Sequence, residues 1–172
     1  STNQVFQDNI EGAGRLMSHV EVGGNNLIFT ETQTYTFRYI GLPNVWEIKI
    51  KSTEIGIIAA MARCSVNDVA YWMDDNNFYM WEGGNVEVIP SNSQYQSTIH
   101  NYVYSNINTG QKSKIFAWYD DLFNEMWVHY PSAGSNEPDR VARVNIQDNV
   151  WVPDTVDRTS AEYPVISLVN PK

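Results

Sequence analysis

The clearest indication of fold in this 172-residue chain is Tyr71-Trp72-Met73-Asp74-Asp75-Asn76-Asn77-Phe78. Aromatic rings suit the pleated surface of a β-strand, and consecutive Asp and Asn residues favour a tight turn because they hydrogen-bond the local backbone. The stretch therefore predicts a β-hairpin. Two more stretches combine an aromatic strand end, a polar turn and a second aromatic or apolar strand: Ile28-Phe29-Thr30-Glu31-Thr32-Gln33-Thr34-Tyr35 and Trp118-Tyr119-Asp120-Asp121-Leu122-Phe123-Asn124-Glu125.

The three predicted hairpins recur at a nearly regular spacing, with 43 residues from Phe29 to Trp72 and 46 from Trp72 to Trp118. A period of roughly 40 to 50 residues with about four short strands is typical of β-propeller blades, whose apolar faces are covered by neighbouring blades. We therefore expect an all-β fold made of antiparallel blades, about three to four of them. Because few propellers close with so few blades, residues 1–172 are expected to form a single repeat domain, a fragment of a larger propeller. A β-sandwich is the alternative.

Alternation of apolar and polar residues supports this prediction outside the hairpins. Tyr35, Phe37 and Tyr39 would share one face of a strand that ends at Gly41-Leu42-Pro43-Asn44, and Trp46, Ile48 and Ile50 one face of the next. The apolar run from Gly56 to Ala62 predicts a strand covered on both sides, and residues 97–108 predict a short helix. The other predicted strands are Val69–Met73, Phe78–Trp81, Val86–Ile89, Ile115–Tyr119, Glu125–Tyr130, Arg140–Ile146 and Val150–Val152, the last stopped by Pro153.

Composition restricts the classes of partner. A net charge of −9 opposes generic binding to nucleic acid or to an anionic membrane, although a local basic patch remains compatible with it. No apolar run approaches the roughly 20 residues that a membrane-spanning helix needs. The single cysteine, Cys64, excludes an internal disulfide framework and favours a buried structural thiol, which fits assembly in a reducing cytoplasm.

Catalytic and metal-binding patterns are weak in this sequence. Asp74-Asp75 and Asp120-Asp121 are adjacent pairs in predicted turns, where neighbouring side chains diverge, so a turn-forming role is favoured over a catalytic or calcium-binding one. His19, His100 and His129 lack the spacing of metal ligands, and His129 is expected to be a hydrogen-bonded sheet histidine. The pairs Gly23-Gly24 and Gly83-Gly84 are expected in turns. We predict no enzyme activity and no cofactor.

Tryptophans are the candidate contact residues. Trp72, Trp118 and Trp127 lie inside strand patterns and are expected in the core or in packing between blades. Trp46, Trp81 and Trp151 lie near strand ends and are the candidates for contact with a ligand or partner, although core packing is favoured for them too. A second candidate feature is an ion-pair cluster that would staple the loop ending near residue 140. Its members would be Glu137, Asp139 and Arg140 with Arg143 or Arg158.

Several stretches resemble structural proteins of tailed-phage particles, and more loosely the propeller-bearing tail nozzle and DNA-stabilising plug of short-tailed phages. The resemblance covers about two thirds of the chain. It is found in Gly56-Ile57-Ile58-Ala59-Ala60, Tyr71-Trp72-Met73, Asn77-Phe78-Tyr79, Tyr102-Val103-Tyr104, Asn106-Ile107-Asn108, Phe123-Asn124-Glu125 through Tyr130-Pro131-Ser132, Glu137, Asp139-Arg140, Asn145, Trp151 and Asp157-Arg158-Thr159.

This resemblance implies a structural role in the tail or head–tail junction of a virion assembled in the host cytoplasm. The expected partners are other virion proteins and copies of the chain itself in a ring, with DNA passing without binding. An acidic surface agrees with such passage, because non-specific affinity for DNA comes from cations that neutralise phosphates. One alternative is a glycan-binding module for host attachment. Another is a glycoside hydrolase or sialidase remnant, against which the absence of the Ser-x-Asp-x-Gly-x-x-Trp box counts.

Overall fold

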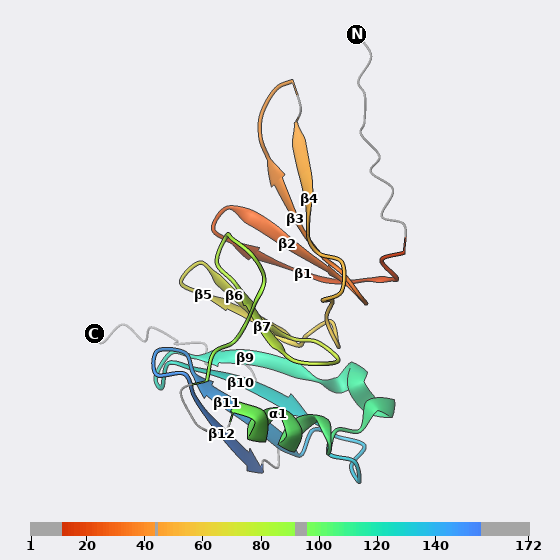
Figure 1. The fold of residues 1–172 in the computed structure, drawn as a ribbon, viewed down its shortest axis with the longest axis vertical. Helices are drawn as coiled ribbons and strands as arrows, with labels where there is room; N and C mark the ends of the chain where they lie inside the picture. Colours follow the sequence, from red (N-terminus) through yellow and green to blue (C-terminus); the bar gives the residue numbers. More distant parts are fainter. Residues whose placement is uncertain (1–11, 44, 92–95, 156–172) are drawn as a thin grey trace, which may run out of the picture.

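The computed structural model describes residues 12–43, 45–91 and 96–155, and these contain three antiparallel sheets of four consecutive strands each (Figure 1). The first sheet has the order β1-β2-β3-β4, with β1 Leu16–Val22, β2 Asn25–Thr30, β3 Thr34–Tyr39 and β4 Trp46–Ser52. The second has β5 Arg63–Val66, β6 Val69–Met73, β7 Phe78–Trp81 and β8 Glu87–Val88. The third has β9 Phe116–Asp120, β10 Glu125–Tyr130, β11 Arg140–Asn145 and β12 Val150–Thr155.

The all-β prediction is confirmed, and each sheet is the four-stranded meander expected of a blade. The first strands of successive sheets contact each other, β1 with β5 and β5 with β9, as the innermost strands of successive blades do. Figure 1 shows the three sheets stacked one on the next, with the β3–β4 hairpin projecting from one end. The described sheets are compatible with a propeller-like or sandwich arrangement, and they do not close into a barrel.

Short polar turns connect the strands as the sequence predicts. Gly23 and Gly24 join β1 to β2 with φ of +54° and +74°, a conformation that glycine adopts without strain. In the β6–β7 turn the Asp74 backbone N–H donates to the Asn77 carbonyl at 2.9 Å. The Asp74 carboxylate also accepts from the backbone N–H of Asn76 at 3.0 Å, which is the local bond expected of a turn aspartate.

The predicted repeat is wrong for the third hairpin, which does not occupy the same position in its sheet as the first two. The hairpins around residues 31 and 75 join the second and third strands of their sheets, but the Trp118 hairpin joins β9 to β10, the first and second strands. Its counterpart in the third sheet is the loop of residues 131–139 between β10 and β11. Turn chemistry is local and recurs at several strand connections, so similar hairpins need not occupy equivalent positions in a blade.

The predicted strand from Gly56 to Ala62 is instead a buried loop between the first and second sheets. Ile57, Ile58, Ala59 and Ala62 are buried as expected, whereas Ala60 and Met61 are exposed. The backbone makes single hydrogen bonds to all three sheets instead of a ladder, and the bond to the third sheet is from Ala117 N–H to the Met61 carbonyl at 2.8 Å. Ile57 N–H donates to the Thr30 carbonyl at 3.1 Å, and Ile58 N–H donates to the Met73 carbonyl at 3.0 Å. An apolar run predicts burial on both sides, and here a connection between packed sheets satisfies that requirement.

Pro153 does not stop the last strand, because β12 continues to Thr155 and Pro153 pairs with Ala142. Within the described sheet β12 is an edge strand, where a residue without an N–H is tolerated because its outer side has no ladder to complete. The predicted short helix is confirmed as α1 Gln96–Tyr104, followed by the 3₁₀ helix η1 Thr109–Lys114.

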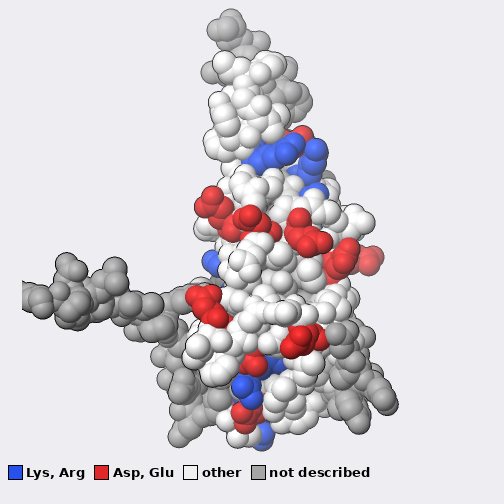
Figure 2. All heavy atoms as spheres, turned by 90° about the vertical axis from the view of Figure 1, so that its left-hand side faces the viewer, with Lys and Arg blue, Asp and Glu red and all other residues white. Residues whose placement is uncertain are grey.

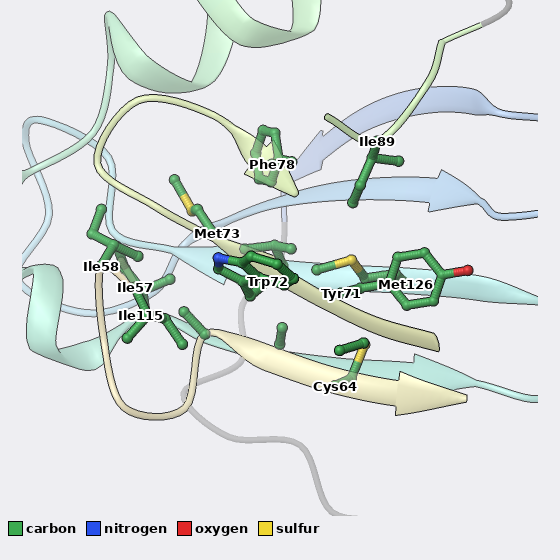
Figure 3. Close-up of a cluster of buried hydrophobic side chains, with 14 of the residues drawn as sticks. Ile57, Ile58, Cys64, Tyr71, Trp72, Met73, Phe78, Ile89, Ile115 and Met126 are labelled. Atoms are coloured by element: carbon green, nitrogen blue, oxygen red, sulfur yellow. The ribbon is translucent and has the colours of Figure 1, made fainter. Parts of the chain in front are cut away.

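The core lies between the sheets and is continuous from β1 to β11. Trp72 is fully buried at its centre, with its ring 5.0 Å from that of Phe29 and its Nε1–H donating to the Gly56 carbonyl at 2.9 Å. Figure 3 shows the loop residues Ile57 and Ile58 beside Ile115, and Cys64 on the same side of the cluster as Tyr71. Burial raises the pKa of the Cys64 thiol to about 12, so the expectation of a buried structural thiol is confirmed.

Candidate anion-binding cleft and apolar arm

A cleft of about 220 Å³ opens between the first sheet and the β7–β8 connection of the second. We call it the basic cleft. It is lined by Asn25, Thr36, Arg38, Glu47, Lys49, Lys51, Trp81 and Gly83. Most of these side chains are polar, and three of them are cations.

The period-2 alternation of β3 and β4 places the polar side chains on one face. Arg38 pairs with Glu47 and Thr36 with Lys49 across the two antiparallel strands, so their side chains share a face. The same face carries buried Leu27 on β2, directly opposite Thr36. The inter-sheet seam is therefore apolar near the inner strands and becomes polar toward β4, which is where the cleft opens.

One carboxylate in the cleft, that of Glu47, pairs with two cations. Arg38 Nε–H donates to Glu47 Oε2 at 2.8 Å, and Lys49 Nζ lies 3.0 Å from Glu47 Oε1. Hydrogen bonds from Lys49 and Arg38 lower the pKa of Glu47, so this carboxylate stays ionised at neutral pH. With three cations and one carboxylate, the cleft keeps a positive surplus.

Trp81 borders the cleft, but its ring is not available for stacking. Its side chain is only 2% exposed, and its Nε1–H donates to the Gly84 carbonyl at 2.9 Å. Lys51 Nζ lies 5.6 Å from the ring centroid, which is a cation–π geometry. Trp81 therefore holds Lys51 beside the cleft, and the indole face predicted for ligand contact is already covered.

Figure 2 shows a group of basic side chains below the projecting tip of the molecule, with acidic side chains spread over the middle of this face. The cleft cations belong to the base of the β3–β4 hairpin. The net charge of −9 is compatible with a local basic patch, and this basic group is such a patch. The sequence signal for it was the run Glu47, Lys49, Lys51 on one strand face, but only the fold adds Arg38 and Trp81.

The opposite face of the same hairpin is apolar and exposed. We call residues 37–50 the arm. Trp46 is 56% exposed, and its ring stacks on Phe37 at 4.8 Å and meets Tyr39 edge-on at 5.4 Å. Large apolar side chains that are exposed along the arm are Tyr39, Ile40, Leu42, Val45, Trp46 and Ile50. Of the three candidate tryptophans, Trp46 is the most exposed, since Trp151 is partly buried and Trp81 buried.

Trp151 serves as a packing contact between sheets. Its Nε1–H donates to the Pro90 carbonyl at 3.3 Å, and its ring lies 4.7 Å from that of Phe78. The three predicted contact residues thus lie on β4, β7 and β12 with different neighbours, and the structure does not gather them into one site.

Trp118 and Trp127, unlike Trp72, lie outside the buried core. Both are only partly buried and pack against each other at 5.4 Å on the face of the third sheet that points away from buried Met126 and Val128. Trp118 Nε1–H donates to His129 Nε2 at 3.1 Å, so the expectation of a hydrogen-bonded sheet histidine is confirmed.

The paired aspartates act in turns, as predicted. Asp74 accepts from Gly56 and Asn76, whereas Asp75 points elsewhere and pairs with Lys112 at 3.1 Å. Asp120 accepts from the backbone of Leu122 at 2.9 Å. Within residues 12–43, 45–91 and 96–155, no three His, Cys, Asp or Glu side chains are grouped so as to hold a metal ion.

The predicted ion-pair cluster is divided among separate pairs. Asp139 lies 3.9 Å from Arg140, but Glu137 pairs with Lys114. Arg143 pairs instead with Glu125 at 3.6 Å and Asp154 at 3.4 Å, which are on its neighbouring strands. Arg158 lies outside the described residues.

Comparison of the sequence with protein-family models and with curated proteins found no match. Among the described helices, none has the length and apolar character to cross a bilayer. The interpretation of the basic cleft and the arm therefore depends on their own geometry and chemistry.

Proposed function

We propose that this chain is a non-enzymatic structural component of a tailed-phage virion, in the tail or head–tail junction, and that it acts by assembling with other subunits. The observation that supports assembly best is the exposed apolar face of the arm. A contiguous group of large apolar side chains on a protein surface marks an interaction site. The resemblance of residues 56–159 to virion proteins supports the phage particle as its setting.

Alternation along β3 and β4 places the apolar side chains of the arm on one face of the hairpin. Phe37 pairs with Ile48 and Tyr39 with Trp46, so their side chains lie on the face opposite the basic cleft. In a propeller-like arrangement both faces of a blade are covered by neighbouring blades. The first sheet packs on the second through its cleft-side face, and a neighbouring subunit would cover the apolar one.

Charge and carboxylate placement are consistent with this proposal. The net charge of −9 would let DNA pass without adhering, because adhesion requires cations that neutralise phosphates. Asp74 and Asp120 accept hydrogen bonds within their own turns and Asp75 pairs with Lys112, which agrees with a turn-forming role and not with the paired carboxylates of a glycosidase.

Peptide mass spectrometry of density-purified phage particles tests the proposal. We expect stoichiometric peptides of this chain, with chemical cross-links from the arm to itself or to another virion protein. The double variant Leu42→Ser/Trp46→Ser should be depleted from particles. Its matched control is Leu122→Ser/Phe123→Ser, which alters two equally exposed apolar residues in the β9–β10 turn. Absence of the chain from particles would falsify the virion role.

Glycan binding is the second candidate function, and one observation favours it. The basic cleft is small, polar and positively charged, which suits a polar ligand with an acidic group better than an apolar partner surface. This alternative does not involve the apolar face of the arm.

A further inference from the structure

The basic cleft has cations whose charge the described part of the chain does not balance. Lys51 has a cation–π contact with Trp81 but no ion pair among residues 12–43, 45–91 and 96–155. Arg38 and Lys49 share the single carboxylate of Glu47. Most described cations elsewhere have carboxylate partners of their own: Arg15 with Glu31, Lys112 with Asp75, Lys114 with Glu137, Arg140 with Asp139, and Arg143 with Glu125 and Asp154. Arg63 instead donates to the Ser18 hydroxyl at 2.7 Å.

The size of the cleft restricts the ligand. Its volume of about 220 Å³ lies below the roughly 300–1,000 Å³ of pockets for drug-sized molecules, so it accommodates one small polar unit. Its neutral lining includes the polar residues Thr36 and Asn25. Asn25 Nδ2 donates to the Gly23 carbonyl at 3.2 Å, which fixes the orientation of that amide.

Glu47 distinguishes between kinds of anion. An ionised carboxylate at the wall repels a compact dianion such as phosphate, but it accepts hydrogen bonds from hydroxyl groups. A ligand with one carboxylate and several hydroxyls would interact favourably with both the cations and the carboxylate of the cleft. Lys51 would meet its carboxylate, and Glu47 would accept from a hydroxyl.

We propose that the basic cleft binds a monoanionic, carboxylate-bearing sugar unit, of the kind that occurs in acidic polysaccharides. Lys51 is the residue that selects the acidic group, because it is the cleft cation without a carboxylate partner in the described residues. Trp81 is a positioning residue that holds Lys51 through its ring. The site lies on the opposite face of the hairpin from the apolar face of the arm, so sugar binding and assembly can fail independently.

Sodium glucuronate is the probe, with glucose as the neutral control and inorganic phosphate as the competing anion. Titration of the ¹⁵N-labelled chain by NMR at low salt should show saturable shifts at Gly83 and in β3–β4 with glucuronate, and none with glucose. Lys51→Gln should weaken binding about tenfold, the effect of losing one charge-assisted hydrogen bond. Lys112→Gln removes an exposed lysine distant in sequence from the cleft and should leave the affinity unchanged.

Four outcomes would overturn the proposal. Phosphate binding tighter than glucuronate would make the cleft an oxyanion site. Equal shifts with glucose and glucuronate would show that the negative charge of the sugar does not contribute to binding. Absence of saturable glucuronate binding, or an affinity that Lys51→Gln leaves unchanged in a chain that circular dichroism shows to be folded, would remove the site.

Discussion

Gly56 and Asp74 are joined by a hydrogen bond from the Gly56 backbone N–H to Asp74 Oδ2 at 3.1 Å, which fastens the connection between the first two sheets to the β6–β7 turn. The same glycine accepts from Trp72 Nε1 through its carbonyl at 2.9 Å. The backbone of Gly56 is thus hydrogen-bonded to the second sheet through both its N–H and its carbonyl. The geometry of this junction fixes the relative position of two sheets and hence of the basic cleft between them.

Gly56→Ala is expected to destabilise the fold strongly. A Cβ at this position would lie 2.4 Å from the Glu31 carbonyl oxygen, and relief requires backbone movement. We expect a loss of about 1–3 kcal/mol in the free energy of unfolding, typical of overpacking. Urea denaturation measures it, with Gly134→Ala as control because a Cβ there meets nothing within 4 Å. Equal stability of the two variants would contradict the proposed close packing.

Asp74→Asn should change how stability depends on pH. Burial is the largest influence on Asp74 and raises its pKa above the usual 3.8, although bonds from Asn76 and Gly56 oppose the shift. Since the folded state then holds the proton more tightly than the unfolded state, wild-type stability is favoured below 3.8 and falls as pH rises through the raised pKa. Asp74→Asn lacks this component. The difference in unfolding free energy between the two proteins, measured from pH 3 to 7, should move in favour of the variant; a constant difference would contradict the assignment.

Cys64 is expected to be unreactive in the folded protein. Its thiol is buried and its pKa is raised to about 12, so at pH 8 roughly one molecule in ten thousand carries the thiolate. A chromogenic disulfide reagent should label it within seconds in 6 M guanidinium but only at the rate of unfolding in buffer. Rapid labelling of the folded chain would show that the second sheet opens locally.

The sequence predicted those features that depend on local alternation and turn chemistry. The pattern Tyr35, Phe37, Tyr39 followed by Trp46, Ile48, Ile50 gave the hairpin and its apolar face, both of which the structure confirms. The basic cleft could not be predicted in the same way, because Trp81 and Gly83 reach it from another sheet, 30 or more residues along the chain from the β3–β4 residues. Packing between sheets is not encoded in a period-2 pattern.

Burial and aromatic character do not by themselves specify where a residue lies in the fold. The run from Gly56 to Ala62 specifies burial, and burial is satisfied equally by a central strand or by a connection enclosed between sheets. Trp118 and Trp127 share a strand face with polar Glu125 and Arg143. Arg143 lies over the Trp127 ring at 4.9 Å, which allows both rings to remain partly exposed. An aromatic residue within a strand therefore does not by itself specify the core.

The arm is expected to mediate association between copies of the chain in solution. Leu42 is 87% exposed and Trp46 56%, while Leu122 and Phe123 in the β9–β10 turn are 83% and 58% exposed. Replacing either pair by serine removes nearly the same exposed apolar character, and such surface changes usually alter the unfolding free energy by less than about 0.5 kcal/mol each. Trp46 lies on the apolar face of the arm with Tyr39 and Ile50, and Leu42 lies in the β3–β4 connection of the same hairpin, whereas Leu122 and Phe123 lie in a separate turn. Sedimentation velocity over a range of concentrations should therefore show self-association of the wild type and of Leu122→Ser/Phe123→Ser, and loss of it in Leu42→Ser/Trp46→Ser. If both double variants associate as the wild type does, the arm is not the surface through which copies of this chain meet.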